Sequence, residues 1–334
     1  GLRASRPDPR DELSFLHELG RSVARGIARA RLVAAVRDAG ERFELILGRL
    51  TTAVTLRDRE GKLLYANDAA VDLLGASTLE EALSSTGAVA QLAMRFAFAL
   101  EDGSPVTLRH LPADRLRRGE DSSPVVIRSV ERVSGRERWI AVRARMLDRE
   151  GGLLASISED VTEVKREQIR AALLAGAGGL GAPQASTEAA LTGLSELVVP
   201  ALADWACVHV REGGDLRLVA VSHQDPKRRA RVRDLLTRWS PRLDAPGGIG
   251  EAIRSGEPQL HPYLTDDLLR EYAWDAGHLR SLEELLLRSA LCVPIALPDG
   301  GGAALSLVMA DSWRRFDRRQ LELARELAAR TEKT

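Results

Sequence analysis

The hydrophobic period changes abruptly around position 160, and this feature constrains the fold more than any other. Apolar residues alternate within Gly152–Ser158, as they do in a half-buried strand. The charged run Val164–Arg170 that follows favours a helix. A strand therefore passes directly into a helix, and either Asp160 or Thr162 can cap that helix by accepting backbone N–H bonds. Such a junction suits the transfer of a small shift in a sheet to an exiting helix.

Length, charge and composition exclude several classes of protein. The 334 residues suggest about two domains. Lys and Arg together number 48, as do Asp and Glu, so no net charge attracts nucleic acid or an anionic membrane. Aromatic residues make up only 4%, which argues against stacking platforms for single-stranded nucleic acid. The apolar runs are shorter than the ~20 residues of a membrane-spanning helix. We therefore expect neither nucleic-acid nor membrane partners.

The cysteines and the first residues indicate the compartment. Cys207 and Cys292 are too few for a disulfide framework and fit a reducing cytoplasm, where both can be small buried residues. Residues 1–7 contain no apolar signal-peptide core. We expect a cytoplasmic protein.

Residues 1–40 are predicted to form an N-terminal helix. Within residues 11–50, small and apolar residues recur at steps of three and four. Their stripe is thin and lies between two charged faces, which suits a coiled-coil seam between two chains. The alternative is one amphipathic helix lying on its own domain. The segment also resembles the closing helix of a preceding sensor domain, which would make the chain a fragment. The stripe comprises Leu13, Leu16, Gly20, Val23, Ile27, Ala30 and Ala34.

Residues 41–163 are predicted to form one α+β domain. It begins with a hairpin over 53–67, whose turn contains Gly61. A short helix then starts with Asn67 or Asp68 as its cap. The other expected elements are the helix 68–74, helical stretches at 79–83 and 89–100, and strands at 125–131, 138–147 and 153–158.

The order of these elements resembles the PAS fold of sensor domains. The resemblance implies an antiparallel sheet with helices on one face and a ligand-sized hollow between them. No single matching motif is specific, but their order is. The matching motifs are Asp58-x-x-Gly61, Tyr65–Ala70, Leu73-Leu74-Gly75, Arg138-Trp139 and Asp160-Val161-Thr162.

Residues 164–186 are predicted to be a linker, and residues 187–334 a second α+β domain. The linker begins as a charged helix, while its Gly-rich half, 176–183, is expected to be irregular. The fold class is therefore α+β, with two domains joined by helical linkers. The second domain is expected to have helices at 187–203, 226–239, 266–287 and 318–330, and strands at 206–211, 216–223, 259–263, 290–297 and 304–310.

The second domain resembles the GAF fold, another small-ligand sensor module. It is most similar to GAF domains that follow PAS domains in bacterial histidine kinases and in phosphatases that regulate anti-sigma systems. The resemblance therefore implies a sensory role. The matching pieces are Ala203-Asp204-Trp205, Gly250 to Gly256-Glu257-Pro258, Arg288–Ile295, and Arg315-Phe316-Asp317 followed by an apolar helix.

No motif predicts catalysis, and the cofactor remains unknown. His17-Glu18-Leu19 lacks the continuation of a kinase phospho-acceptor segment, and the histidines show no metal-ligand spacing. Residues 41–163 contain no cysteine for a covalent flavin bond, and His110 is their only candidate haem ligand. Methionine sulfoxide reduction needs reactive thiols, whereas Cys207 and Cys292 lie in apolar strand patterns. We predict that the chain is not an enzyme.

Strand alternation supplies candidate pocket residues. In the strand 138–147 one face carries four apolar side chains, and in the GAF-like domain Cys207 alternates with Val208. For every candidate the alternative is that it only fills the core. The PAS-like candidates are Ile140, Val142, Ala144 and Met146, and the GAF-like candidates are Cys207, His209, His223, Tyr263, Tyr272 and Trp274, with Trp205 beside them.

The sequence therefore predicts a homodimeric sensory region that relays a signal through its helices. A small molecule or a partner protein would provide the signal, and an output domain outside this chain would receive it. Asp160 and Thr162 are the predicted signal-relay residues. One alternative is a ligand-free interaction scaffold with side chains filling both hollows. Another is a GAF enzyme that uses Cys207 and Cys292.

Overall fold

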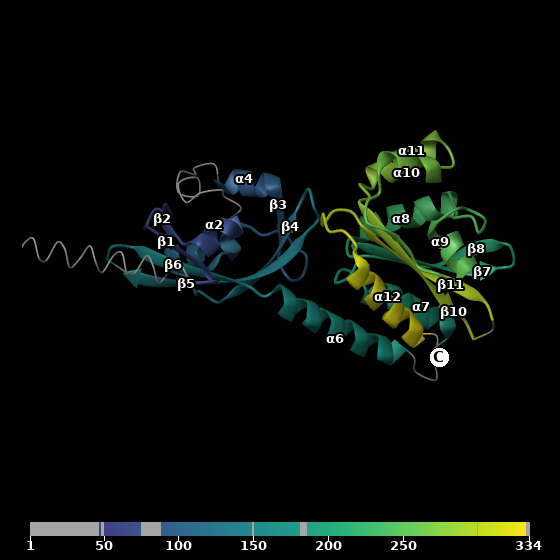
Figure 1. Ribbon diagram of the computed structural model, residues 1–334, viewed down its shortest axis with the longest axis horizontal. Helices are drawn as coiled ribbons and strands as arrows, with labels where there is room; N and C mark the ends of the chain where they lie inside the picture. Colours follow the sequence, from purple (N-terminus) through teal and green to yellow (C-terminus); the bar gives the residue numbers. More distant parts are fainter. Residues whose placement is uncertain are drawn as a thin grey trace, which may run out of the picture. The chain divides into compact units, whose positions relative to one another are not determined.

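The computed structural model describes residues 47, 50–74, 88–148, 150–180, 186–298 and 300–331. These residues form two compact units, the first comprising 47, 50–74, 147–148 and 150–157, and the second comprising 88–146, 158–180, 186–298 and 300–331. As predicted, the fold is α+β with two antiparallel sheets flanked by helices (Figure 1). The strand order of the first sheet is β2 (Leu63–Ala66), β1 (Ala53–Arg57), β6 (Leu153–Asp160), β5 (Glu137–Asp148), β4 (Val125–Glu131) and β3 (Phe96–Ala99). The strand order of the second sheet is β8 (Asp215–His223), β7 (Trp205–Glu212), β11 (Gly302–Met309), β10 (Ser289–Ala296) and β9 (Gln259–His261). The predicted coiled-coil segment 1–40 and the predicted helix 79–83 lie outside the described residues.

The first unit contains the predicted hairpin. Strands β1 (Ala53–Arg57) and β2 (Leu63–Ala66) pair in antiparallel fashion, and helix α2 (Asp68–Leu74) follows. Buried Asn67 joins these elements, because its Oδ1 accepts from Val54 N at 2.9 Å and from Ala70 N at 3.0 Å. Asn67 is therefore the cap of α2, one of the two residues predicted for that role.

The predicted helix over 89–100 is only partly confirmed. Helix α4 (Ala88–Arg95) ends early, and residues Phe96–Ala99 form strand β3, which pairs with β4 (Val125–Glu131). The alternation Phe96-Ala97-Phe98-Ala99 has the period of two that a strand requires. Ladder bonds to β4 therefore outweigh the helical period of the preceding turn. The remaining elements here are η1 (Leu108–His110), α5 (Pro112–Arg117), β5 (Glu137–Asp148) and β6 (Leu153–Asp160).

Helix α6 (Thr162–Leu180) is longer than predicted, since it continues through the first part of the Gly-rich run. The prediction of an irregular chain from residue 176 was wrong for residues 176–180. Leu173 and Ala177 are buried in a core that also contains Leu194 of α7 (Thr187–Leu197). A Cβ on Gly176 would lie 2.5 Å from Leu197 Cδ1. Glycine thus permits close packing of α6 on α7, and that packing offsets its poor helix propensity.

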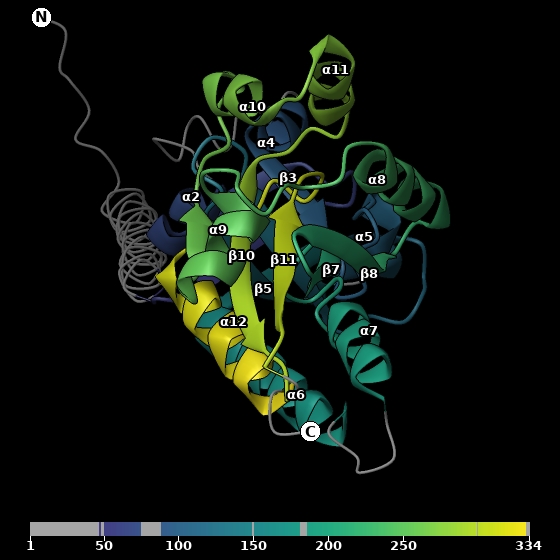
Figure 2. The same cartoon turned by 90° about the vertical axis from the view of Figure 1, so that its right-hand side faces the viewer.

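The second sheet lies between two layers of helices (Figures 1 and 2). Helices α7 and α12 cover one face, and α8 to α11 cover the other. The predicted helix 266–287 is two helices, and the predicted helix 187–203 ends at Leu197. The elements are β7 (Trp205–Glu212), β8 (Asp215–His223), α8 (Pro226–Arg238), α9 (Gly248–Ser255), β9 (Gln259–His261), α10 (Asp266–Tyr272), α11 (Ala276–Glu284), β10 (Ser289–Ala296), β11 (Gly302–Met309) and α12 (Arg318–Thr331).

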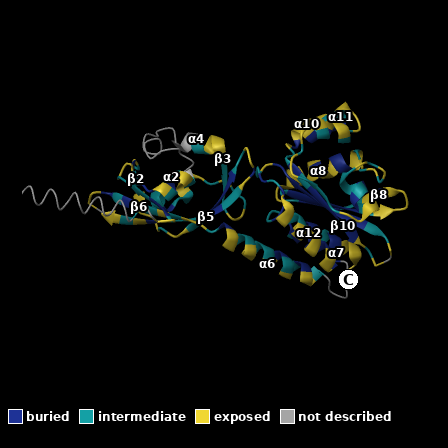
Figure 3. Cartoon of the chain, viewed as in Figure 1, coloured by how far each residue is buried: buried dark blue, intermediate teal, exposed yellow. Residues whose placement is uncertain are grey.

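The two faces of this sheet are packed differently. The face toward α7 and α12 carries the larger apolar core, which includes Val208, Leu305, Leu307 and Leu327. Figure 3 shows the strands of this sheet mostly as buried. The other face carries a smaller core that includes Trp205, Val221 and Leu235. A sheet buried on both faces requires runs of apolar residues, as β11 shows.

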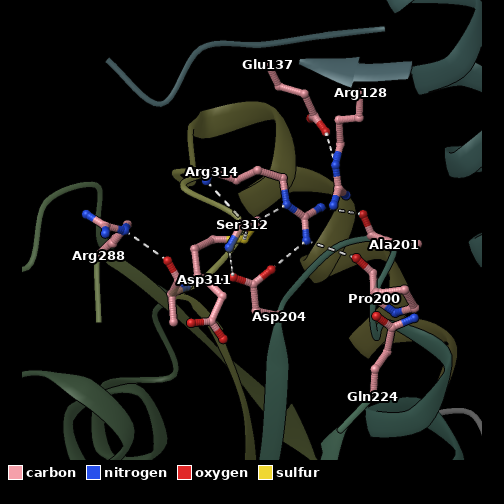
Figure 4. A network of polar contacts seen from close by, with 12 residues as sticks. Arg128, Glu137, Pro200, Ala201, Asp204, Gln224, Arg288, Asp311, Ser312 and Arg314 are labelled. Carbon is pink, nitrogen blue, oxygen red and sulfur yellow. Dashed lines mark hydrogen bonds and ion pairs between the residues drawn. The ribbon is translucent and has the colours of Figure 1, made fainter. Parts of the chain in front are cut away.

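A buried ion pair fixes the start of β7 against the end of β11 (Figure 4). Arg314 Nη2 donates to Asp204 Oδ1 at 3.0 Å, and both side chains are nearly inaccessible to solvent. Asp204 Oδ2 also accepts from the backbone N–H groups of Ala310 and Ser312, at 2.7 and 3.0 Å. Burial would raise the pKa of Asp204, but Arg314 and these N–H groups outweigh burial and hold that pKa below its usual value.

Candidate functional site

A cavity of about 390 Å³ lies between the second sheet and helices α8, α9, α10 and α11. Its size falls in the usual range for small-molecule pockets. All of its lining residues belong to the segment 205–308, so the cavity lies within one domain. It is the best candidate for a functional site among the described residues.

The register of the strands defines the cavity floor. Trp205 of β7 pairs with Val308 of β11, Val308 pairs with Ala290 of β10, and Ala290 pairs with His261 of β9. Directly paired residues point to the same face of a sheet, so these four side chains form one row. They all line the cavity.

A second row is made of small, soft polar side chains. Cys207 of β7 pairs with Ser306 of β11, which pairs with Cys292 of β10. Ser306 Oγ donates to Cys292 Sγ at 3.4 Å. Because Ser306 separates them, the two cysteines lie two strand spacings apart, about 10 Å, which is too far for a disulfide.

Aromatic side chains form the wall opposite the floor. The ring of Trp239, which follows α8, stacks on the ring of His278 with centroids 5.1 Å apart and planes 12° apart. Trp239 Nε1 donates to Asp275 Oδ2 at 3.3 Å. Asp275 also caps α11 by accepting from His278 N at 2.8 Å. The α11 cap therefore positions both members of the stacked pair.

The mouth of the cavity is formed by the loop before α9 and the segment after α10. Trp274 is exposed there, and the Arg242 guanidinium lies 5.4 Å from the centre of its ring. Gly250 packs directly on the loop, since a Cβ at this position would lie 2.3 Å from Arg242 O and 2.7 Å from Leu243 O. Only glycine permits this backbone contact at the mouth.

Burial keeps the interior of the cavity uncharged. It lowers the pKa of His261, and it lowers the pKa of His278 against the weaker opposing attraction of Asp275. It also raises the pKa of Cys207, and raises that of Cys292 to about 12. Near neutral pH both histidines are therefore neutral and both cysteines are thiols.

Two polar atoms of the lining residues are buried without a hydrogen-bond partner among the described residues. They are Trp205 Nε1 and His261 Nε2. Trp205 as a whole is only 6% exposed. Buried N–H groups normally have partners, so each of these atoms calls for an explanation.

The predicted GAF-like site residues divide into two groups. Cys207, Tyr272 and Trp274 line the cavity, as does Trp205. His209, His223 and Tyr263 do not line it, which corrects the expectation that they would. His209 is fully buried farther along β7, beyond a register shift that follows Val208. His223 Nδ1 accepts from Asp225 N at 2.8 Å at the end of β8, and Tyr263 is 58% exposed.

The four predicted residues of β5 lie elsewhere. Ile140 and Ala144 are buried, whereas Val142 and Met146 are half-buried, and none of the four lines the GAF-like cavity. The opposite face of β5 contributes buried Trp139, whose ring lies 5.7 Å from the Arg128 guanidinium. Both faces of β5 therefore contribute buried side chains.

The prediction omitted three aromatic lining residues, His261, Trp239 and His278. Strand alternation could have found His261, because its neighbour Leu260 packs against the core on the other face of the sheet. Trp239 and His278 lie at helix ends, and no sequence period distinguishes them. Only the packing of α8 against α11 brings them together.

The predicted relay residues lie at the junction of β6 with α6. Thr162 is the first residue of α6, and its Oγ1 accepts from Trp139 N of β5 at 2.9 Å. Asp160 Oδ1 accepts from Thr162 N at 2.9 Å and from the Thr162 hydroxyl. Asp160 therefore caps the helix, while Thr162 ties its first turn to the sheet.

Within the described part of the chain, no three His, Cys, Asp or Glu side chains gather as a metal site would require. No helix in these same residues has the length and apolar character needed to span a membrane.

Residues 186–334 match the family model of the GAF domain, so this part of the chain is a GAF domain. Similar solved structures include fRMsr of Staphylococcus aureus in complex with its substrate, at 18% identity and a TM-score of 0.35, covering 49% of this chain and 94% of that one. The GAF domain of a phosphoenolpyruvate-protein phosphotransferase from Coxiella burnetii is 20% identical, with a TM-score of 0.35 and coverage of 50% and 92%. The second GAF domain of DevS from Mycobacterium smegmatis is 21% identical, with a TM-score of 0.31 and coverage of 43% and 90%. No curated protein matches the chain.

Proposed function

We propose that this chain is the sensory region of a bacterial signal-transduction protein, in which the GAF domain binds a small molecule. GAF domains are commonly sensory or regulatory modules of signalling proteins. The preceding segment, 41–163, would be a PAS domain. The output would be a histidine kinase or a PP2C-type serine phosphatase, carried by the full-length protein or by a partner.

The observation that carries this proposal is the cavity of about 390 Å³ on one face of the GAF sheet. A domain that served only as a scaffold would gain stability by filling this space with side chains. Instead, aromatic walls surround it, and Trp205 Nε1 and His261 Nε2 have no partner among the described residues. A bound molecule would supply both the missing contacts and a hydrogen-bond partner.

Helix α6 supports the relay part of the proposal. It starts at the Asp160–Thr162 cap, and its buried residues Leu173 and Ala177 belong to the core beneath the GAF sheet. A change in the sheet on ligand binding would therefore reach a helix that leads to the junction. Such a switch requires two states with different affinities for the ligand.

The chemistry of the cavity favours binding over catalysis. Cys207 and Cys292 are thiols at neutral pH, and each is buried. They lie too far apart to form a disulfide with one another without movement of the strands. The cavity thus lacks the reactive thiolate and nearby resolving thiol that a thiol-based reduction needs.

Native mass spectrometry of the purified chain tests the proposal. We expect an excess mass that is retained in the native spectrum and lost on denaturation. Ala290→Phe places a large ring on the cavity floor and should abolish this mass. Ala230→Phe, on the exposed face of α8, is the matched control and should retain it.

Three results would count against the proposal. A chain that carries no excess mass from cells, and whose melting temperature no small molecule in a metabolite panel raises, would favour the interaction scaffold. Excess mass that survives Ala290→Phe would place the ligand outside the GAF cavity. Turnover of a bound compound that Cys207→Ser with Cys292→Ser abolishes would favour an enzyme.

A further inference from the structure

We propose that the ligand of the GAF cavity is an uncharged, flat ring molecule with a hydrogen-bond acceptor, such as a ring carbonyl, that accepts from the Trp205 indole N–H. The proposal rests on the proposed function and specifies its ligand class. It combines three properties of the cavity: its charge, its aromatic lining and its unpartnered donor.

The charge of the cavity lining indicates that the ligand is uncharged. The titratable groups inside the cavity are His261, His278, Cys207, Cys292 and Tyr272, and burial favours the neutral form of each. The two charged residues of the lining, Arg242 and Glu271, are exposed at the mouth. A charged ligand would leave water without gaining an opposite charge inside, so the cavity selects against it.

The aromatic lining of the cavity indicates that the ligand is a flat ring molecule. Six aromatic side chains line the cavity, and such side chains favour stacked and edge-on contacts with another ring. Trp239 and His278 already stack, and the rings of His261 and Tyr272 meet edge to face at 6.0 Å. Most of the remaining lining residues are aliphatic. The six residues are Trp205, Trp239, His261, Tyr272, Trp274 and His278.

The row of side chains on the floor sets the position of the ligand. Trp205 and His261 stand at the two ends of the row, with Val308 and Ala290 between them. Three strand spacings separate the two ends, or about 14 Å between Cα atoms. A flat ring over Val308 and Ala290 would therefore lie between the two lining residues that carry the unpartnered atoms Trp205 Nε1 and His261 Nε2.

The unpartnered donor fixes the polar feature of the ligand. An indole N–H can only donate, so its partner must be an acceptor. Trp239 differs in this respect, because its N–H already donates to Asp275. His261 Nε2 either donates or accepts according to its tautomer, so it adds a polar contact without determining its direction.

Three probes with two fused rings each separate these features. Coumarin is neutral and flat with a ring carbonyl, naphthalene has the same shape without an acceptor, and coumarin-3-carboxylate adds a negative charge. Binding to the full chain at pH 7 is measured by titration calorimetry. We expect coumarin to bind, and the carboxylate to bind at least tenfold more weakly because the interior of the cavity offers it no countercharge.

Trp205→Phe isolates the hydrogen bond. It should weaken coumarin about five- to tenfold, the effect of one neutral hydrogen bond, and leave naphthalene unchanged. Trp239→Phe is the matched control, and it should change the affinity for both probes by the same factor. Unchanged naphthalene binding also shows that the Trp205→Phe cavity remains folded.

Each result that contradicts these expectations overturns one part of the proposed ligand class. Equal effects of Trp205→Phe on both probes would remove the indole N–H from ligand recognition. Carboxylate binding as tight as that of coumarin would overturn the uncharged class. If neither coumarin nor naphthalene bound, the flat-ring class would be wrong, while the retained mass in native mass spectrometry would still decide the proposed function separately.

Discussion

At the scale of single residues, this chain places titratable groups where burial dominates their behaviour. His209 is the clearest case, because it is fully buried and its Nε2 has no partner among the described residues. Its Nδ1 lies 3.9 Å from Cys207 Sγ. Burial lowers the pKa of His209 from 6.5 to about 4, which makes the folded GAF domain sensitive to acid.

We predict that His209→Met removes part of this acid sensitivity. Between pH 6.5 and 4 the unfolded chain binds a proton at His209 that the folded chain does not bind. The contribution of this pKa difference to the stability of the folded state is therefore complete above pH 6.5. That contribution is lost as the pH falls to about 4, and it amounts to about 3 kcal/mol for a shift of this size. Urea unfolding at pH 7 and pH 4 should show a smaller fall in stability for the variant. An equal fall in both proteins would refute the role of His209.

At the scale of elements, the β6–α6 junction depends on a few side-chain bonds. Thr162 accepts from Trp139 N, and Asp160 caps the helix. The sequence predicted a cap at Thr162 or Asp160 but did not reveal that Thr162 is bonded to β5. That bond joins positions 23 residues apart, so only the pairing of strands shows it.

We predict that Thr162→Val loosens this junction while keeping its shape. The substitution leaves the buried Trp139 N–H without its partner, which costs about 1–3 kcal/mol. Hydrogen exchange should become faster at the Trp139 amide and in the first turn of α6. Glu163→Gln, one residue away and exposed, is the control. If Thr162→Val exchanges no faster than this control, Thr162 does not hold the helix to the sheet.

Substitutions at the same junction in the full-length protein test whether it relays a signal. Asp160→Ala with Thr162→Ala should leave the fold of the domain intact and weaken the response of the output activity to a ligand. An unchanged response would remove these two residues from the relay.

Glycines also differ in role between elements. We predict that Gly250→Ala destabilises the GAF domain by more than 1 kcal/mol, because its Cβ would collide with the backbone oxygens of Arg242 and Leu243. Gly178→Ala is the matched control, since it lies in α6 with nothing within 4 Å of the added Cβ, and it should stabilise by up to about 1 kcal/mol. Thermal melting of both variants measures this difference, and a neutral Gly250→Ala would show that the loop can move aside.

At the scale of the whole molecule, the main prediction is that two chains associate through their helices. The stripe in residues 11–50 and the helix 164–175 are the expected contacts. We predict that the chain sediments as a dimer, and that Leu16→Glu with Ile27→Glu raises the dissociation constant at least tenfold by placing charges in the seam. Glu18→Gln, near the seam, is the control. A monomeric wild-type chain would refute the dimer.

The sequence by itself determined most elements of this protein, because hydrophobic period is a local property. The hairpin 53–67 and the strand-to-helix change near residue 160 follow from alternation and turn residues. The strands of the GAF domain follow from short apolar runs bounded by turn residues. The local period gave the wrong prediction at Phe96–Ala99, where a helical and a strand pattern overlap. It was also wrong at Gly176, where tight packing on Leu197 offsets the poor helix propensity of glycine.

Only the tertiary structure decided the cavity and its chemistry. Its lining comes from four strands, four helices and their loops, spread over residues 205–308. Trp205 and His261 share one row because β11 and β10 lie between their strands, a strand order that no local pattern encodes. Burial then sets which groups are neutral and which donor lacks a partner. Burial depends on contacts between residues far apart in the chain, so the charge and the hydrogen-bonding capacity of the site emerge only in the fold.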